Sequence, residues 1–362
     1  MRSGLCLRML DAEARVETSA AGFRAALAAL YRPAVRRSVC GAVAYRYEGS
    51  IDLRERGDAR RLTPGPVSAA LAHALLFGSL AGRVRSHLLL HAAALRAPAG
   101  GVLIAGDSGR GKTTLALSLA LRGFGLYSDE VAALSRRTGF VRAFPRGALL
   151  RAGTLELLPS LAASAEAWAL EGDDAAACWH PAERAHAAPV RRVFLLDGGE
   201  RGGEGVVRAA VSHLTPRLAA ALRAEPGLAG AFVSAHRECV SLEWEAPLAA
   251  EALARWSELC GAEGVRLLNA WSAEARPTFA RAAALEPRGT LATAMRLSAG
   301  VWNRGAADGE GGVAARTLWE VARALRGARC YALRPGPLDE TAALVSEACR
   351  RSGGRRCAGV AG

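Results

Sequence analysis

One stretch of the chain combines residue types and a spacing that could bind phosphate. Gly106 to Thr113 reads Gly-Asp-Ser-Gly-Arg-Gly-Lys-Thr and fits the pattern G-x-x-x-x-G-K-[ST] without deviation. Glycines let the backbone curl so that successive N–H groups point at phosphate oxygens, and a helix that starts there adds its dipole. Lys112 would reach the β- and γ-phosphates of ATP, and the Thr113 hydroxyl would ligate Mg²⁺. The motif therefore predicts a site for ATP and Mg²⁺.

The lysine count supports this interpretation. Lys112 is the only lysine among the 47 Lys and Arg residues of the chain. A guanidinium is not interchangeable with a compact ammonium that must reach a phosphate oxygen. We expect Lys112 to lie in an exposed loop and to contribute little to stability. The predicted nucleotide-binding residues are Gly106, Asp107, Ser108, Gly109, Arg110, Gly111, Lys112, Thr113 and Thr114.

Local patterns place the motif between a strand and a helix. The apolar run Gly101–Ala105 is typical of a strand buried on both faces. A helix is expected over Lys112–Arg122, and Gly123 would end it. Further strands are expected over Leu126–Leu134 and Val141–Pro145. A buried strand, a glycine-rich loop and a helix in this order are the context that the motif requires.

Two acidic sites compete to hold the metal ion. Asp129 and Glu130 lie on the strand after the helix, and Asp197 ends the apolar run Val193–Leu196. Asp197 is followed by Gly-Gly-Glu, not directly by a glutamate, and the chain lacks an LSGGQ-like signature. We therefore favour Asp129 as the acid linked to Mg²⁺, with Thr113 and Glu130 as further ligands. Asp197 is interpreted as a strand end that enters a turn.

The segment His91–Val131 resembles the core of the bacterial HPr kinase/phosphorylase family, whose architecture is shared with phosphoenolpyruvate carboxykinases. His91 stands fifteen residues before Gly106, the loop reads GDSGRGKT, and the acidic pair begins seventeen residues beyond Lys112. Both spacings match the family. Strong similarity is confined to this segment, and weaker similarity extends over most of the chain.

Two further segments extend the resemblance, and two features depart from it. Ala143–Arg146 resembles the F-P-R segment of HPr-kinase-related proteins from peptide-modifying gene clusters. Leu333–Leu338 resembles the R-P-G segment near the family's C-terminus. The family's Asp-Asp pair is Asp129-Glu130 here, and its E-x-R-G-x-G signature is missing. The departures leave open whether HPr itself is the substrate.

The resemblance implies a fold and individual roles. The fold would be α/β, a P-loop kinase core of the HPr kinase/phosphoenolpyruvate carboxykinase type. This core is a mixed β-sheet with flanking helices, and a small N-terminal α+β unit would be added to it. Asp129 would act as the base towards a substrate serine, with His91 beside it and Lys112 neutralising the γ-phosphate. Arg146 and Arg334 would contact phosphate or substrate. The resembled enzymes assemble as oligomers, which implies a homo-oligomer.

The chain divides into three predicted parts. Residues 1–85 form the N-terminal unit, 86–345 the catalytic domain and 346–362 a frayed tail. Ala20–Leu30 and Ser68–Leu80 have the apolar spacing of helices in the first part, and Ala42–Tyr47 alternates like a strand. In the second part, Val190–Leu196 is a predicted strand, Gly172–Ala188 a lid or mobile loop, and three helices are expected over Pro159–Leu170, Thr215–Ala224 and Leu248–Leu259.

Composition limits the protein class. A hydrophobic content of 51% excludes a mostly disordered chain. The net charge of +13 is spread over scattered arginine pairs, which favours a solvated surface over a nucleic-acid partner. No apolar run approaches ~18 residues, so no membrane span is expected. The charged N-terminal stretch does not resemble a secretory signal, which indicates a cytoplasmic protein whose eight cysteines are buried or idle thiols.

Three functions are compatible with these residues. The first is an ATP-dependent kinase that acts on Ser or Thr of a protein or peptide. The second is a P-loop ATPase or nucleotide-dependent regulatory module without phosphoryl transfer to a protein. The third is a small-molecule kinase or a carboxykinase-like enzyme, which is disfavoured because the chain has no lysine beyond Lys112 for further metal and substrate contacts.

Overall fold

The structure is a computed structural model. It describes residues 3–36, 43–55, 58–61, 68–106, 110–171, 173, 175–182, 185–196, 205–211, 220, 232–236, 239–246, 258, 267–274, 280–303 and 310–350. Asp107, Ser108, Gly109 and Asp197 lie outside the described residues. So do the predicted tail from 351 onward and, apart from residues 220 and 258, the helices predicted over 215–224 and 248–259.

The N-terminal part is a sheet with two helices. Its strands follow the order β3-β1-β2-β4-β5-β6, in which β2 and β4 are parallel and the other neighbours antiparallel. Alternate residues of β2 are buried, as expected for a sheet with one covered face. The elements are β1 (Ser3–Met9), β2 (Ala12–Thr18), α1 (Ala21–Leu30), a 3₁₀ turn (Arg32–Ala34), β3 (Val35–Arg36), β4 (Val43–Tyr47), β5 (Ile51–Glu55), β6 (Asp58–Arg61) and α2 (Ala69–Ala81).

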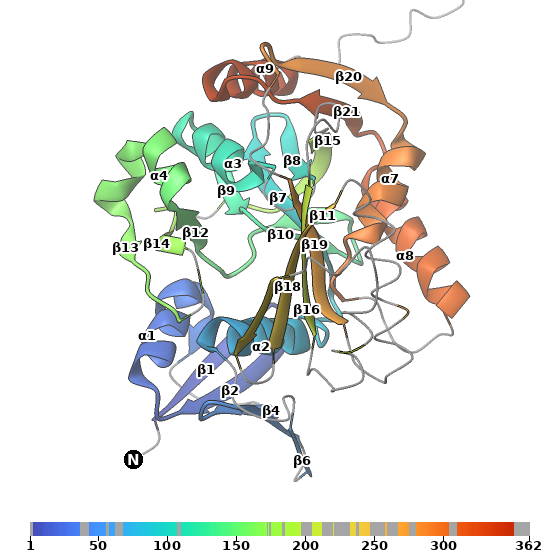
Figure 1. Cartoon of the computed structure of the whole chain (residues 1–362). Helices are drawn as coiled ribbons and strands as arrows, with labels where there is room; N and C mark the ends of the chain where they lie inside the picture. Colours follow the sequence, from blue (N-terminus) through green and yellow to red (C-terminus); the bar gives the residue numbers. More distant parts are fainter. Residues whose placement is uncertain are drawn as a thin grey trace, which may run out of the picture.

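A mixed sheet forms the centre of the molecule (Figure 1). Its order is β11-β10-β7-β8-β15-β21-β20, and β9 adds to β7. Strand β15 is parallel to β8 and β21, whereas β7 is antiparallel to β8, β9 and β10. The strands are β7 (His87–Ala97), β8 (Gly100–Ala105), β9 (Gly125–Ser128), β10 (Val131–Ser135), β11 (Phe140–Arg142), β15 (Ala188–Leu196), β20 (Ala284–Arg288) and β21 (Arg329–Arg334).

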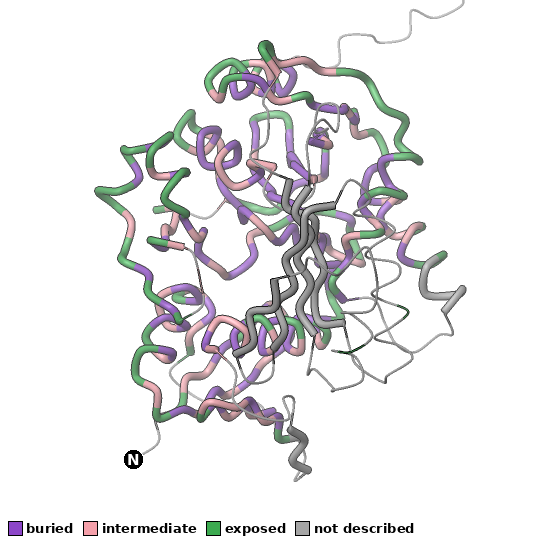
Figure 2. The backbone as a smooth tube through the Cα atoms, viewed as in Figure 1, coloured by how far each residue is buried: buried purple, intermediate pink, exposed green. Residues whose placement is uncertain are grey.

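Helices cover both faces of this sheet (Figure 1). Val102 and Ile104 of β8 pack on α3 (Lys112–Leu121) and α9 (Leu338–Arg350). Leu103, between them, faces the opposite layer of α7 (Thr290–Ala299) and α8 (Glu310–Ala324). Because successive side chains of a strand point to opposite faces, a continuous apolar run is what a strand between two helical layers needs. Figure 2 colours most residues of β7, β8 and α3 as buried.

Smaller elements complete the described fold. A three-stranded sheet, β12-β14-β13, lies next to α4, and a four-stranded sheet has the order β17-β18-β16-β19. Their bounds are β12 (Ala148–Arg151), α4 (Ala152–Leu157), a 3₁₀ helix (Pro159–Ser164), β13 (Glu166–Ala167), β14 (Ala175–Trp179), β16 (Gly205–Val211), β17 (Phe232–His236), β18 (Cys239–Ala246) and β19 (Leu267–Glu274).

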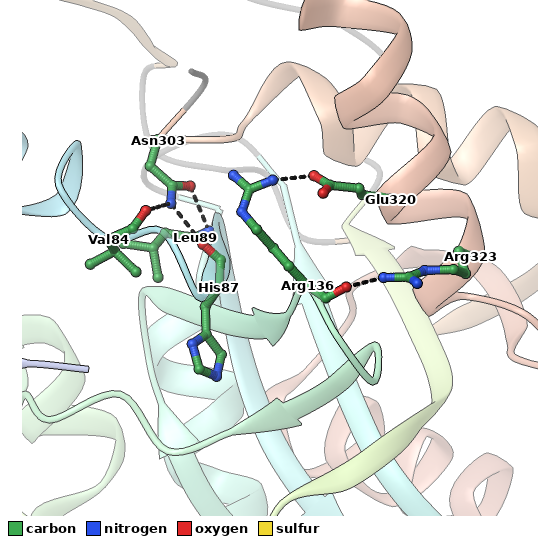
Figure 3. A network of polar contacts seen from close by, with 7 residues as sticks. All are labelled: Val84, His87, Leu89, Arg136, Asn303, Glu320 and Arg323. Carbon is green, nitrogen blue, oxygen red and sulfur yellow. Dashed lines mark hydrogen bonds and ion pairs between the residues drawn. The ribbon is translucent and has the colours of Figure 1, made fainter. Parts of the chain in front are cut away.

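The N-terminal part shares a hydrophobic core with the central sheet. Leu89 of β7, Val131 of β10 and Phe144 belong to the same buried cluster as Tyr31 and Leu76. Farther along the chain, buried Asn303 fastens the segment after α7 to β7, donating to the carbonyls of Val84 (2.9 Å) and His87 (2.7 Å) and accepting from the Leu89 N–H (2.9 Å; Figure 3). Segments from three regions of the sequence thus meet at one end of β7.

The mixed α/β class predicted from the sequence is confirmed, and the helices expected in the N-terminal part correspond to α1 and α2. The helix predicted over Pro159–Leu170 is wrong: a 3₁₀ helix ends at Ser164, and Glu166–Ala167 pairs with β14 instead. The loop predicted over Gly172–Ala188 contains that strand, β14. In both places sheet pairing overrides local helix or loop preference.

Two other features of the described residues bear on the sequence predictions. Cys178, Cys330 and Cys349 are buried free thiols, as expected, and Cys6 is a half-buried one. Among the described residues, none of the helices combines the length and apolar character needed to span a bilayer.

Candidate active site

The glycine-rich segment joins the central strand β8 to α3. Gly111 precedes the helix with φ +81°, a left-handed conformation that a residue without a Cβ adopts at little cost. Gly106 follows β8 in close contact with β15, because a Cβ at this position would lie 2.8 Å from the Leu196 Cβ. The two glycines therefore meet separate requirements: one allows the turn into the helix, and the other lets the backbone pass the neighbouring strand.

Lys112 lies at the first position of α3 and is buried, with an exposed fraction of 7%. Its Nζ donates to the carbonyl oxygen of Gly106 at 2.8 Å, across the loop. The prediction that Lys112 is exposed is therefore wrong. The prediction that it contributes little to stability stays a prediction. The ammonium is held against the backbone carbonyl at the point where the chain leaves β8.

The next two residues of α3 point to different partners. The Thr113 hydroxyl donates to Oδ2 of Asp129 at 3.1 Å. Oγ1 of Thr114 lies 3.0 Å from Oγ1 of Thr154 at the start of α4. Thr113 thus joins the helix start to the acidic pair, as the sequence prediction requires, while Thr114 joins the same helix to its neighbour.

The acidic pair lies at a break in what the sequence predicts as one strand. Strands β9 and β10 both pair with β7, and Asp129 and Glu130 separate them. The Ser128 hydroxyl accepts from the N–H groups of Glu130 (3.3 Å) and Val131 (3.0 Å), and Glu130 accepts through its carbonyl from the Ala92 N–H (3.0 Å). The interruption is therefore hydrogen-bonded into the sheet and fixes the two carboxylates beside α3.

The two carboxylates differ in their electrostatics. Burial raises the pKa of Asp129 to about 6, although the positive charge of Arg146 opposes the shift. Burial would also raise the pKa of Glu130, but the Arg146 guanidinium and the neighbouring His91 bring that pKa below its usual value. Glu130 is therefore the permanently charged member of the pair, and Asp129 is the member that can exchange a proton near neutral pH.

Arg146 is the ion-pair partner of Glu130. Its side chain is only 7% exposed, and its Nη1 donates to Oε2 of Glu130. Burial would lower the pKa of Arg146, but the charge of Glu130 reverses this effect, and the guanidinium stays charged. Arg334, in contrast, is half-exposed at the end of β21, and its ion pair is with Glu286 at 3.6 Å, not with the acidic pair. Of the two predicted arginines, the structure brings only Arg146 to the carboxylates.

His91 lies on β7 opposite Val131, next to the acidic pair. Its backbone N–H donates to the Gly300 carbonyl at 2.8 Å. Its imidazole ring packs edge-on against Trp302, with ring centroids 5.7 Å apart. Trp302 is 40% exposed and also contacts Phe77 of α2 at 5.1 Å. The structure therefore brings His91 to the carboxylates, as the resemblance implies, and adds an exposed indole beside it.

The oxygen atoms near Thr113 fit a magnesium ion. Asp129 Oδ1 is buried and has no hydrogen-bond partner among the described residues, so this oxygen has a free lone pair. Mg²⁺ prefers oxygen ligands and is commonly held by one or two carboxylates together with substrate phosphates. Groups of three or more His, Cys, Asp or Glu side chains with metal-binding geometry do not occur within the described ranges. Thr113 and Asp129 are the ligands that fit, whereas the Glu130 carboxylate is engaged by Arg146.

The sequence predictions did not include Tyr31 and His73, which lie near Arg146 and Glu130, or Trp302, which packs on His91. None of the three stands in a motif or at a diagnostic spacing, so only the tertiary structure reveals them. Neither a protein-family model nor a curated protein sequence matches this chain. The residues of the site are therefore what indicates a function.

Proposed function

We propose that the protein is an ATP-dependent kinase of the HPr-kinase-like type that transfers the γ-phosphoryl group to a Ser or Thr hydroxyl of a protein or peptide. The observation that carries the proposal is the hydrogen bond between Thr113 and Asp129. It joins the start of the phosphate-loop helix to a buried carboxylate whose other oxygen has no hydrogen-bond partner among the described residues.

Each residue has a task in this reaction. Backbone N–H groups of the loop and the Lys112 ammonium bind the phosphates and neutralise their charge. Thr113 and Asp129 would hold Mg²⁺, which, when bound, adds positive charge at the phosphates. A carboxylate that accepts a proton from the attacking hydroxyl must be basic near neutral pH; burial raises the pKa of Asp129 towards that range, and a bound Mg²⁺ would lower it. His91 and the Arg146–Glu130 pair flank it.

The substrate hydroxyl oxygen forms a bond to the γ-phosphorus while the bond from that phosphorus to the β–γ bridging oxygen breaks. ADP leaves with the bridging oxygen, and the hydroxyl proton passes to the carboxylate of Asp129. Glu130 is a weaker candidate for the base because its carboxylate is paired with Arg146 and its pKa is lowered.

The test is phosphoryl transfer from γ-labelled ATP with Mg²⁺ to bacterial protein extracts and to Ser/Thr peptides, followed by mass spectrometry of the products. We expect a phosphorylated Ser or Thr with the wild-type chain and at least a hundredfold slower transfer with Asp129→Asn. ATP hydrolysis without any phosphorylated protein or peptide would overturn the kinase assignment and indicate an ATPase or a nucleotide-dependent regulatory module. Transfer to a metabolite instead would indicate a small-molecule kinase.

A further inference from the structure

A buried tyrosine–histidine pair in the N-terminal part lies next to the candidate active site. Tyr31 directly follows α1 and is fully buried, and His73 lies on α2 with an exposed fraction of 9%. The Tyr31 hydroxyl is 2.8 Å from Nε2 of His73. Two helices that are far from the phosphate loop in the sequence therefore share one buried polar contact.

This pair is linked to Arg146. The Arg146 side chain lies beside the Tyr31 hydroxyl, and the charges of Arg146 and Glu130 act on both Tyr31 and His73. A backbone hydrogen bond joins the same two segments, because the N–H of Gly147, the residue after Arg146, donates to the Leu30 carbonyl at 2.7 Å. The end of α1 thus contacts both the side chain of Arg146 and the backbone beside it.

The donors in this chain of contacts can be assigned by elimination. A guanidinium has only donors, so towards Arg146 the Tyr31 oxygen can act only as an acceptor. The arrangement that also satisfies the buried Tyr31 O–H directs it to His73, whose Nε2 is then the unprotonated ring nitrogen. Burial and then the charge of Arg146 lower the pKa of His73 to about 3, so a neutral ring is the stable form at neutral pH. Burial likewise raises the pKa of Tyr31, which keeps its proton.

The same helix supports the opposite side of the site. Phe77, one turn after His73 on α2, packs edge-on against Phe144 (6.2 Å between centroids) and against Trp302 (5.1 Å). Trp302 in turn packs on His91. One face of α2 therefore touches both the phenylalanine of the F-P-R segment and the aromatic neighbour of the active-site histidine.

We propose that Tyr31 and His73 are positioning residues: they hold Arg146 so that it fixes Glu130 and leaves Asp129 available to the substrate, which makes the N-terminal part a component of the active site. A buried guanidinium needs oxygen partners in fixed directions, and a carboxylate on one side and a phenol on the other supply them. This proposal rests on the proposed function, because it is the transfer reaction that Arg146 and the carboxylates serve.

The kinetic test compares two deletions of a buried phenol oxygen in the same part of the chain. Tyr31→Phe removes the hydroxyl that lies beside Arg146 and pairs with His73, whereas Tyr45→Phe removes a hydroxyl that donates to Ser79 Oγ at 2.9 Å. We expect Tyr31→Phe to lower kcat at least tenfold with the KM for ATP changed less than twofold, and Tyr45→Phe to leave both unchanged. His73→Gln, which keeps an acceptor, should retain more kcat than His73→Ala. Equal kcat values for Tyr31→Phe and Tyr45→Phe would overturn the proposal.

A second measurement needs no activity and separates this proposal from the proposed function. Nitrogen-15 NMR of the wild-type histidines should show His73 neutral at pH 7 with the proton on Nδ1 and Nε2 unprotonated. A proton on Nε2 would reverse the Tyr31–His73 hydrogen bond and overturn the proposal, even if a Tyr31→Phe variant does not fold. A wild-type chain that transfers no phosphoryl group contradicts the proposed function, and the histidine tautomer still decides whether Arg146 is held as described.

Discussion

In the proposed function, the single lysine is the residue on which ATP binding would depend most directly. Lys112→Ala removes the only ammonium beside the loop and the hydrogen bond to Gly106. We expect ATP affinity to fall at least tenfold and phosphoryl transfer to be lost. Because Lys112 is buried, its removal should also lower the free energy of unfolding by about 1 kcal/mol. Calorimetric ATP titration and denaturant unfolding measure the two effects.

Arg122→Ala is the matched control for this variant. Arg122 follows the same helix, is half-exposed and pairs with Asp339, so its loss should leave ATP affinity within twofold of wild type. Unchanged ATP affinity in Lys112→Ala would remove the basis for the site.

Neutralising Asp129 and neutralising Glu130 should change the free energy of unfolding in opposite directions. The folded-state pKa of Asp129, about 6, lies above the unfolded value of 3.8, so its ionised form costs stability above pH 6 and this cost disappears below about pH 4. Asp129→Asn should therefore stabilise the fold by roughly 1–3 kcal/mol at pH 8, with no gain at pH 4. The pKa of Glu130 is lowered, so its charge stabilises the fold above the unfolded value of 4.5, and this stabilisation is lost as the pH falls through the lower folded-state pKa.

Glu130→Gln should accordingly destabilise the fold at pH 8. Its ion pair with Arg146 is only partly shielded, because the Glu130 side chain is 35% exposed, and we expect a loss of about 1–2 kcal/mol. Denaturant unfolding of both variants at pH 8 and pH 4 checks these signs. A stability loss for Asp129→Asn at pH 8 would mean that its contact with Thr113 outweighs its burial.

At the residue scale, the sequence predicts what local geometry determines. Gly111, Lys112 and Thr113 have their positions fixed by one strand, one turn and one helix, and a motif records such an arrangement. The partner of Arg146 is different, because Glu130 is brought to it by sheet pairing between segments sixteen residues apart. Tyr31 and His73 come from still farther away, and neither composition nor spacing marks them.

At the element scale, the acidic pair shows why strand boundaries were predicted imperfectly. The run Leu126–Leu134 is apolar enough to be one strand, but Asp129 and Glu130 interrupt its pairing with β7, so that two shorter strands result. An apolar pattern reports burial, whereas the interruption depends on the Ser128 hydroxyl that accepts two backbone N–H groups. Local sequence therefore located the carboxylates and did not reveal the break that presents them.

The close approach of the loop to β15 gives a second prediction at this scale. A Cβ on Gly106 would lie 2.8 Å from the Leu196 Cβ, which is too close for two carbon atoms that are not bonded to each other. Gly106→Ala should push the loop away from β15, lower the free energy of unfolding by about 1–3 kcal/mol and weaken ATP binding, since Gly106 also accepts from Lys112.

Gly153→Ala is the control for the added methyl group. Its Cβ would have no neighbour within 4 Å, and Gly153 lies in α4, where alanine favours the helix. We expect a gain of up to about 1 kcal/mol and unchanged ATP binding. Denaturant unfolding and ATP titration of both variants measure the difference, and equal behaviour would contradict the packing argument.

At the scale of the whole molecule, the predicted division at residue 85 stays a prediction, and the described contacts across it are extensive. Leu89 and Val131 of the central sheet share a core with the N-terminal strands, and α2 reaches Phe144 and Trp302. The composition of residues 1–85 indicated helices and strands but carried no sign of what they would cover. Long-range packing decides which surface the N-terminal helices and strands cover, and no local pattern in the sequence shows that packing.

Asn303 provides the last prediction, because one buried amide joins the chain after α7 to β7 and to the residues before it (Figure 3). Asn303→Ala leaves the carbonyls of Val84 and His87 and the N–H of Leu89 without this partner. Unsatisfied buried polar groups cost about 1–3 kcal/mol each, so a total loss of at least about 3 kcal/mol is expected. Ser298→Ala, which removes a hydroxyl bonded to the Ala294 carbonyl within α7, should cost less than about 1 kcal/mol. Denaturant unfolding compares the two variants, and equal losses would mean that water or backbone movement replaces the Asn303 contacts.

The same substitution should affect the residue before it. The backbone N–H of Trp302 donates to the Leu89 carbonyl at 2.8 Å, next to the Asn303 contacts. The Asn303→Ala variant should therefore also weaken the packing of the Trp302 indole against His91.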